Sequence, residues 1–144
     1  MNKEKGFSLL ELLIVVAIIL IIATIAIPSL LRSRQVAHET SAVANLKTLN
    51  TAQITYTTTS GGTYGTMTEL INSGLVDSRF NSIMSGYNYT FSLAVNLRDF
   101  TVYATAASTI EGRFDYSTAP DYVIRYTTDS SRAPTGLAGQ PVQQ

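Results

Sequence analysis

The stretch Lys5-Gly6-Phe7-Ser8-Leu9-Leu10-Glu11, followed by an apolar run to Ile27, decides the fold of the N-terminal part of this chain. A helix that crosses a membrane needs about 20 apolar residues at a rise of about 1.5 Å each, and this run is long enough. Glu11 is the only charged residue between Phe7 and Ile27. A carboxylate inside such a helix is costly and needs a partner, and the run contains no basic residue. We therefore predict a membrane-spanning helix in which Glu11 has a function.

The residues before the run, 1–6, carry Lys3 and Lys5 like the charged start of a signal peptide. An ordinary secretory signal has an apolar region of about 7–15 residues and is cut on its far side. Here the run is longer, and the small residue at its boundary, Gly6, lies on the near side. A cut after Gly6 would keep the helix and give Phe7 a new α-amino group, about one helical turn from Glu11.

These residues, Gly6-Phe7-Ser8-Leu9-Leu10-Glu11 with Pro28 at the end of the apolar run, resemble the N-terminus of the type IV pilin superfamily, including the pseudopilins of type II secretion. The close resemblance covers residues 3–30. It implies cleavage between Gly6 and Phe7 by a prepilin peptidase and methyltransferase, with N-methylation of Phe7. It also implies that Glu11 pairs with the Phe7 amine of an adjacent subunit during assembly.

The resemblance predicts a non-enzymatic structural subunit of a type IV pilus-like filament. Its expected partners are further copies of this chain in a helical filament, the prepilin peptidase and an inner-membrane assembly platform. The chain would sit in the inner membrane, in contact with lipid and with its N-terminus cytoplasmic, before it enters an extracellular filament. An alternative is the major pseudopilin of a type II secretion system, which forms a periplasmic pseudopilus. A more distant alternative is a membrane-anchored monomeric domain that binds a ligand at the cell surface.

The composition limits other functions. Ten basic and ten acidic residues leave no net charge, so we expect no strong binding to nucleic acid. There is no cysteine, hence no disulfide, and we expect no cofactor. His38 is the only histidine and lies in the predicted helix, which leaves no Ser/His/Asp set. Asp115, Asp121 and Asp129 are weak calcium candidates, because their spacing is not that of a continuous calcium loop.

After Pro28 the helical pattern continues in amphipathic form to about Thr58. Pro28 lacks a backbone donor and its ring clashes with the carbonyl of Thr24, so we predict a kink or local melting there. One stripe recurs at spacings of three and four: Ala42, Leu46, Leu49, Gln53 and Tyr56. The more polar positions are Arg32, Arg34, His38, Glu39 and Lys47.

The rest of the chain predicts a short helix and a small sheet. Residues 66–73 form the helix, with Thr66 and Glu69 as a capping box. Residues 87–95 alternate between apolar and polar side chains, a turn follows at 96–99, and a return strand begins at Phe100. Two further short strands surround Tyr116 and Ile124. We expect this sheet to pack on the helix near Leu46, Leu49 and Tyr56.

The predicted fold class is therefore α+β, a long kinked N-terminal helix on an antiparallel sheet of three or four strands. The predicted parts are a cleaved leader (1–6), a transmembrane and assembly helix (7–28), an amphipathic second half of the helix (29–60), a globular domain (61–127) and a flexible tail (128–144).

Overall fold

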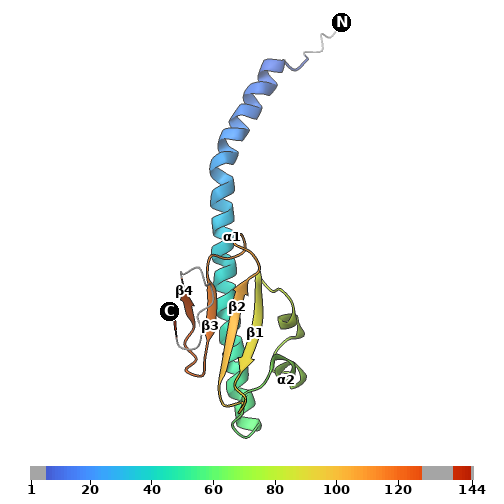
Figure 1. Cartoon of the computed structure of the whole chain (residues 1–144). Helices are drawn as coiled ribbons and strands as arrows, with labels where there is room; N and C mark the ends of the chain where they lie inside the picture. The colour runs from blue at the N-terminus through green and yellow to red at the C-terminus, as the bar shows by residue number, and fades with distance from the viewer. Residues whose placement is uncertain (1–5, 128–137, 144) are drawn as a thin grey trace. The chain divides into compact units, whose positions relative to one another are not determined.

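The computed structural model of the chain describes residues 6–127 and 138–143 (Figure 1). It divides into two compact units, residues 1–34 and 35–144. The elements follow in the order α1 (Leu9–Thr59), α2 (Met67–Asn72), the 3-10 helix η1 (Ser78–Asn81), β1 (Tyr87–Leu93), β2 (Phe100–Ala106), β3 (Asp115–Thr118), β4 (Arg125–Thr127) and β5 (Gln140–Pro141). The predicted α+β class, a long N-terminal helix on a small antiparallel sheet, is confirmed.

The helix α1 stays α-helical through Pro28. Local melting around Pro28 is therefore not seen in the single chain, and it stays a prediction for the assembled filament. In the described part of the chain, α1 is the helix that is long and apolar enough to cross a membrane, judged by length and composition. None of its most apolar window is buried.

The second half of α1 buries the predicted stripe. Ala42, Leu46, Leu49 and Gln53 are buried, and Tyr56 packs against the core at its edge. One assignment was wrong, because Glu39 is buried rather than solvated. It lies three residues before Ala42 and so extends the same stripe by one position.

The short helix α2 begins as its capping box predicts. The Thr66 side chain accepts from the Glu69 backbone N–H at 3.2 Å, and the Glu69 carboxylate accepts from the Thr66 backbone N–H at 2.7 Å. Gly74 follows its end with φ +71°, a conformation that glycine adopts without strain. The next element, η1, was not predicted; Asp77 caps it by accepting from the Arg79 N–H at 2.8 Å.

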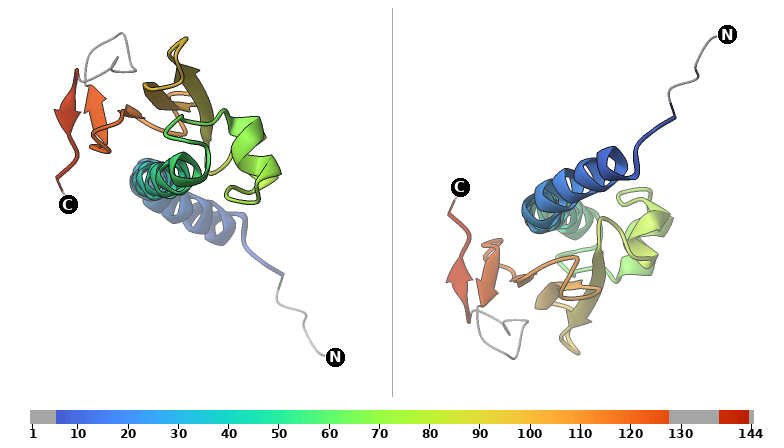
Figure 2. Two further views of the ribbon diagram at one scale, coloured as in Figure 1. Left: turned by 90° about the horizontal axis from the view of Figure 1, so that it is seen from below. Right: turned by 90° about the horizontal axis from the view of Figure 1, so that it is seen from above.

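The five strands form an antiparallel sheet in chain order, β1-β2-β3-β4-β5. The hairpin β1–β2 pairs Tyr87 with Ala106 and Leu93 with Phe100, around the predicted turn at 96–99. The strand predicted around Tyr116 is present as β3, and the one predicted around Ile124 is present as β4, which begins one residue later at Arg125. Seen along the second half of α1, the sheet and α2 cover one side of that helix (Figure 2).

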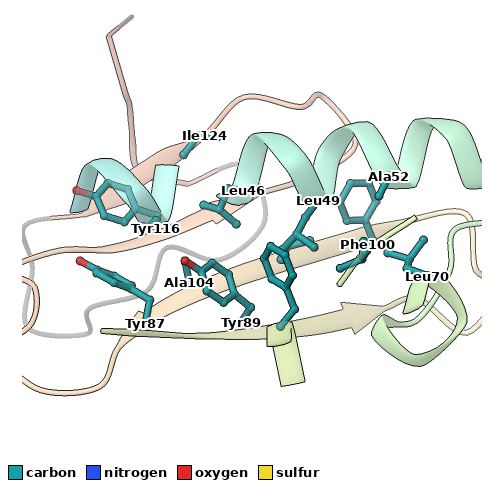
Figure 3. Close-up of a cluster of buried hydrophobic side chains, with 14 of the residues drawn as sticks. Leu46, Leu49, Ala52, Leu70, Tyr87, Tyr89, Phe100, Ala104, Tyr116 and Ile124 are labelled. Carbon is teal, nitrogen blue, oxygen red and sulfur yellow. The ribbon is translucent and has the colours of Figure 1, made fainter. Parts of the chain in front are cut away.

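The core lies between α1 and the sheet. Leu46, Leu49 and Ala52 of α1 face Tyr87, Tyr89, Phe100 and Ala104 of the hairpin, with Leu70 of α2 at one end (Figure 3). Aromatic pairs add directional packing, as where Phe80 of η1 meets Tyr89 edge to face at 5.2 Å between centroids.

The predicted flexible tail, 128–144, falls largely outside the described residues. Within it, residues 138–143 are described, and Gln140–Pro141 forms β5 against β4. The Val142 backbone N–H donates to the Ile124 carbonyl at 2.9 Å, which extends this pairing. The strand β5 was not predicted, because a two-residue segment, Gln140–Pro141, is too short to show an alternating strand pattern.

Candidate processing and assembly site

The helix α1 begins at Leu9, within the stretch that the sequence singles out. The Ser8 carbonyl accepts from the Glu11 N–H at 3.1 Å and from the Leu12 N–H at 3.2 Å. In return, Glu11 Oε2 accepts from the Ser8 backbone N–H at 2.9 Å. Glu11 is thus the N3 half of a capping box, and its carboxylate lies near the positive end of the helix dipole. Because Ser8 directly follows Phe7, this hydrogen bond holds the Glu11 carboxylate beside the residue that follows Phe7.

The first unit presents apolar side chains on every side. Phe7 is 80% exposed, so its ring has no covering neighbour within the described part of this unit. The other exposed large apolar residues of the unit are Leu9, Leu10, Leu12, Leu13, Ile14, Val15, Val16, Ile18, Ile19, Leu20, Ile21, Ile22, Ile25, Ile27, Leu30 and Leu31. A helix that is apolar all round needs lipid or protein around it. Glu11 is the only charge at 7–27, so it is the one position in this span where a neighbour gains from supplying a cation.

Two backbone features accompany Pro28. Proline has no N–H, so the carbonyl four residues earlier, that of Thr24, receives no helical hydrogen bond from it. The Thr24 hydroxyl donates to the Ile21 carbonyl at 2.7 Å, one turn before. A hydroxyl bonded in this way competes with the helical pattern and bends helices. Both features weaken the helical hydrogen bonding around residues 21–28.

A buried ion pair opens the second unit. Glu39 Oε1 accepts from the Arg113 backbone N–H at 2.8 Å and from Arg113 Nε at 3.1 Å, and Glu39 Oε2 accepts from Nη2 at 2.8 Å. The Glu39 side chain is 8% exposed and that of Arg113 is 37% exposed. The hydrogen bond from Glu39 raises the pKa of Arg113 above its ordinary value. Burial, and then the charge of Glu39, raise the pKa of Tyr116 beside the pair.

Two more contacts fasten the β2–β3 loop (residues 107–114) to α1. Gln35 Nε2 donates to the Thr109 carbonyl at 2.8 Å. His38 Nδ1 lies 2.7 Å from Glu111 Oε2. The lone histidine therefore has a structural partner in this unit. These contacts were not predicted, because the two segments lie far apart in the chain.

Buried amides fasten the other end of the helix. Gln53 Nε2 donates to the Gly65 carbonyl at 2.7 Å, and Gln53 Oε1 accepts from the Gly65 N–H at 2.9 Å. Asn50 Nδ2 donates to the Thr118 hydroxyl at 3.0 Å, and the Thr118 hydroxyl lies 3.1 Å from Asn50 Oδ1, to which it can donate. These polar groups are buried and satisfied, so they fix the register between helix and sheet.

The three calcium candidates are not brought together in the described residues. Asp115 is buried in β3 and accepts from the Ala106 N–H at 2.8 Å. Asp121 forms an ion pair with Arg125, which lowers the pKa of the Asp121 carboxyl. Asp129 lies outside the described residues. Within the described part of the chain, no three His, Asp or Glu side chains gather as a metal site.

A groove of about 360 Å³ runs along the second half of α1 beside the sheet. Val36, Val43 and Ala44 of α1 line it, with Tyr116 and Val142 from the sheet side. It offers mostly apolar surface, although Glu39 and Lys47 also line it. Such a lining suits the packing of another apolar element better than the binding of a small polar ligand.

Comparison with known proteins supports one family. Residues 1–27 match the model of the prokaryotic N-terminal methylation motif. The chain is 34% identical over 122 residues to the type IV wide pilus major component PilA4 of Thermus thermophilus, which covers 83% of this chain and 92% of that protein. It is 49% identical over 51 residues to the type IV major pilin protein PilA of Myxococcus xanthus, which covers 35% of this chain and 23% of that protein.

No solved structure shows a significant match. The relative from Thermus is matched over most of both chains, and its match extends far beyond the methylation motif. The described fold, an apolar N-terminal helix continuing into a domain with a small antiparallel sheet, agrees with that match. The chain belongs to the type IV pilin family.

Proposed function

We propose that this pilin is the structural, non-enzymatic subunit of a type IV pilus-like filament, assembled from the inner membrane after cleavage between Gly6 and Phe7 and N-methylation of Phe7. The observation that carries the proposal is Glu11, a lone carboxylate near the start of the exposed apolar first half of α1. Both named relatives are described as type IV pilus or pilin proteins, which favours a pilus over the pseudopilus of type II secretion.

The proposed sequence of events follows from the exposed apolar surface. Lipid covers residues 7–28 before assembly, with residues 1–6 on the cytoplasmic side. Prepilin peptidase removes residues 1–6, and an assembly platform moves the subunit into the filament. There, apolar side chains of neighbouring subunits replace lipid, while residues 61–127 form the globular domain.

Glu11 has two roles in this scheme. In the subunit, its carboxylate accepts the Ser8 N–H and caps the helix. In the filament, its charge would meet the Phe7 amine of an adjacent subunit. An unpaired carboxylate surrounded by apolar helices is strongly unfavourable, whereas a paired one is tolerated. Pairing would therefore select the correct register between subunits.

The test compares Glu11→Gln with Glu11→Ala. Glutamine is a good N3 residue of a capping box, so it keeps the bond to the Ser8 N–H and removes only the charge. Alanine removes both. We expect both variants to insert in the membrane and to be processed at Gly6, and both to give few or no filaments in the material sheared from cells. Intact mass of the wild-type filament subunit should correspond to a chain that begins with methylated Phe7.

A control variant, Asp77→Asn, changes an exposed carboxylate of the globular domain to a residue that can still cap η1, and it should assemble normally. Normal filaments from Glu11→Gln would show that the charge is not needed, and the register mechanism would be wrong. Retention of Met1 in the mature protein would contradict the proposed processing. Methylated subunits that stay in the cell envelope, with none in the sheared material, would favour the pseudopilus.

A further inference from the structure

We propose that the globular domain makes a head-to-tail contact with a second copy of this chain through the two ends of the β1–β2 hairpin. The turn at one end, the hairpin tip (residues 94–99), would pack on the other end of the hairpin in the next copy. The receiving end consists of the β2–β3 loop (107–114) and the turn before β1 (83–86). This inference rests on the proposed function, because it adds a second interface between filament subunits.

The hairpin tip exposes apolar side chains on a rigid, strained turn. Val95 is fully exposed, and Leu97 is exposed beside it. Leu97 has φ +56°, a conformation that is unfavourable for a residue with a branched side chain. Its carbonyl accepts from the Tyr64 N–H at 2.8 Å and its N–H donates to the Ala94 carbonyl at 2.9 Å. Strain held in place by such contacts is a feature of binding surfaces.

The receiving end has the same properties. Ile83 and Ile110 are each more than half exposed. Ser85, in the turn before β1, has φ +51°. The two segments are joined, since the Ala107 N–H donates to the Gly86 carbonyl at 2.9 Å. The loop that carries Ile110 is held to α1 by the contacts of Gln35, His38 and Glu39 described above. Neither apolar residue is presented by a loosely attached segment.

The two surfaces lie at opposite ends of one rigid hairpin, so a single copy cannot bring its own two surfaces together. The pair Leu93–Phe100 lies next to the tip, and the pair Tyr87–Ala106 next to the receiving end (Figure 1). A contact between two different surfaces of identical chains is heterologous, and unless it closes into a ring it extends into a filament. A second copy of the chain is therefore the partner that fits both surfaces.

The charges at the two ends allow this partner. The tip carries Arg98 and Asp99, whereas at the receiving end Glu111 lies against His38 and Arg113 pairs with Glu39. Neither end presents charges of a single sign, so two copies can meet without net repulsion. The area is small, because two pairs of apolar side chains bury only a few hundred Å², below the about 1,200 Å² of a small stable interface. The contact therefore forms only between subunits that their N-terminal helices already hold together in the filament.

Cysteine cross-linking in assembled filaments tests this contact, because the chain has no cysteine of its own. The variant Val95→Cys/Ile110→Cys is expressed as the full chain, and filaments are sheared from cells and treated with a short bis-maleimide. We expect a ladder of dimers, trimers and higher species on denaturing gels. Each single variant should stay monomeric. The control Thr90→Cys/Ile110→Cys, with Thr90 exposed in the middle of β1, should show at least a tenfold weaker ladder.

Intact filaments of the double variant that yield no ladder would overturn the head-to-tail contact, and leave the proposed function standing. Dimers from Val95→Cys alone would also overturn it, because they indicate tip-to-tip packing. If wild-type cells make no filaments, the proposed function itself fails. Where Val95→Cys/Ile110→Cys does not assemble, mixed filaments of the two single variants give the same test, with cross-linked dimers as the expected result.

Discussion

Replacing Arg113 by methionine should destabilise the globular domain by roughly 2–3 kcal/mol. Glu39 would keep its bond from the backbone N–H of residue 113 and lose those from Nε and Nη2. Removing one partner of a buried ion pair costs about 3–5 kcal/mol, because the remaining charge is left without compensation. Arg113 is 37% exposed, so water replaces part of what is lost, and the surviving backbone bond reduces the cost further. The Arg113 guanidinium also lies over the Phe114 ring, 5.1 Å from its centroid, and methionine keeps an apolar stem but loses this contact.

The assay is urea unfolding of the full chain in detergent micelles, followed by the near-ultraviolet circular dichroism of the tyrosines, of which the chain has eight. For a domain of this size the loss corresponds to a fall in Tm of roughly 10 °C. The matched control is Arg79→Met, which breaks an exposed pair with Asp77 whose side chains are 75% and 49% exposed. That substitution should cost below about 1 kcal/mol.

A double variant, Glu39→Gln/Arg113→Met, removes the uncompensated charge and should recover part of the stability lost by Arg113→Met alone. The reasoning would be refuted if Arg113→Met and Arg79→Met had equal effects. It would also be refuted if the double variant lost more free energy of unfolding than the two single variants lose in sum. The buried charge would then not be the cause of the loss.

Three further predictions concern the domain. Gln53→Leu leaves the Gly65 N–H and carbonyl unpaired in the core and should cost about 2–4 kcal/mol in the same unfolding assay, whereas a cost below about 1 kcal/mol would mean that water reaches them. Gly112→Ala would place Cβ 2.0 Å from the Tyr87 hydroxyl, so a clear fall in Tm is expected, and an unchanged Tm would show that the tyrosine moves freely. The pKa of Asp121 is lowered by the arginine four residues later, so its contribution is full above about pH 4 and is lost as the pH falls through the folded-state pKa. Asp121→Asn should therefore flatten the acid side of the stability–pH curve, and an unchanged curve would contradict this assignment.

Short-range rules predicted much of this fold. The capping box at Thr66 and Glu69, the alternating strand that begins at Tyr87 and the buried stripe through Leu46 and Leu49 all depend on neighbours within a few residues. These features are visible in the sequence because helical and strand periodicities are local. The same spacing also indicates that Glu39 is buried, since Glu39 lies three residues before Ala42 on the buried stripe.

The sequence by itself determined the N-terminal span, its single carboxylate and the family, because these depend on the order of residues along one helix. It also determined that a small antiparallel sheet packs on the second half of that helix. Only the tertiary structure decided which cation pairs with Glu39, since Arg113 lies far away in the chain. The same holds for β5, which exists only because β4 offers it an edge. It also holds for the exposed tip at Val95, whose strand pattern predicted a half-buried face. Burial and pairing between distant segments depend on how the chain closes on itself, and no local pattern encodes that closure.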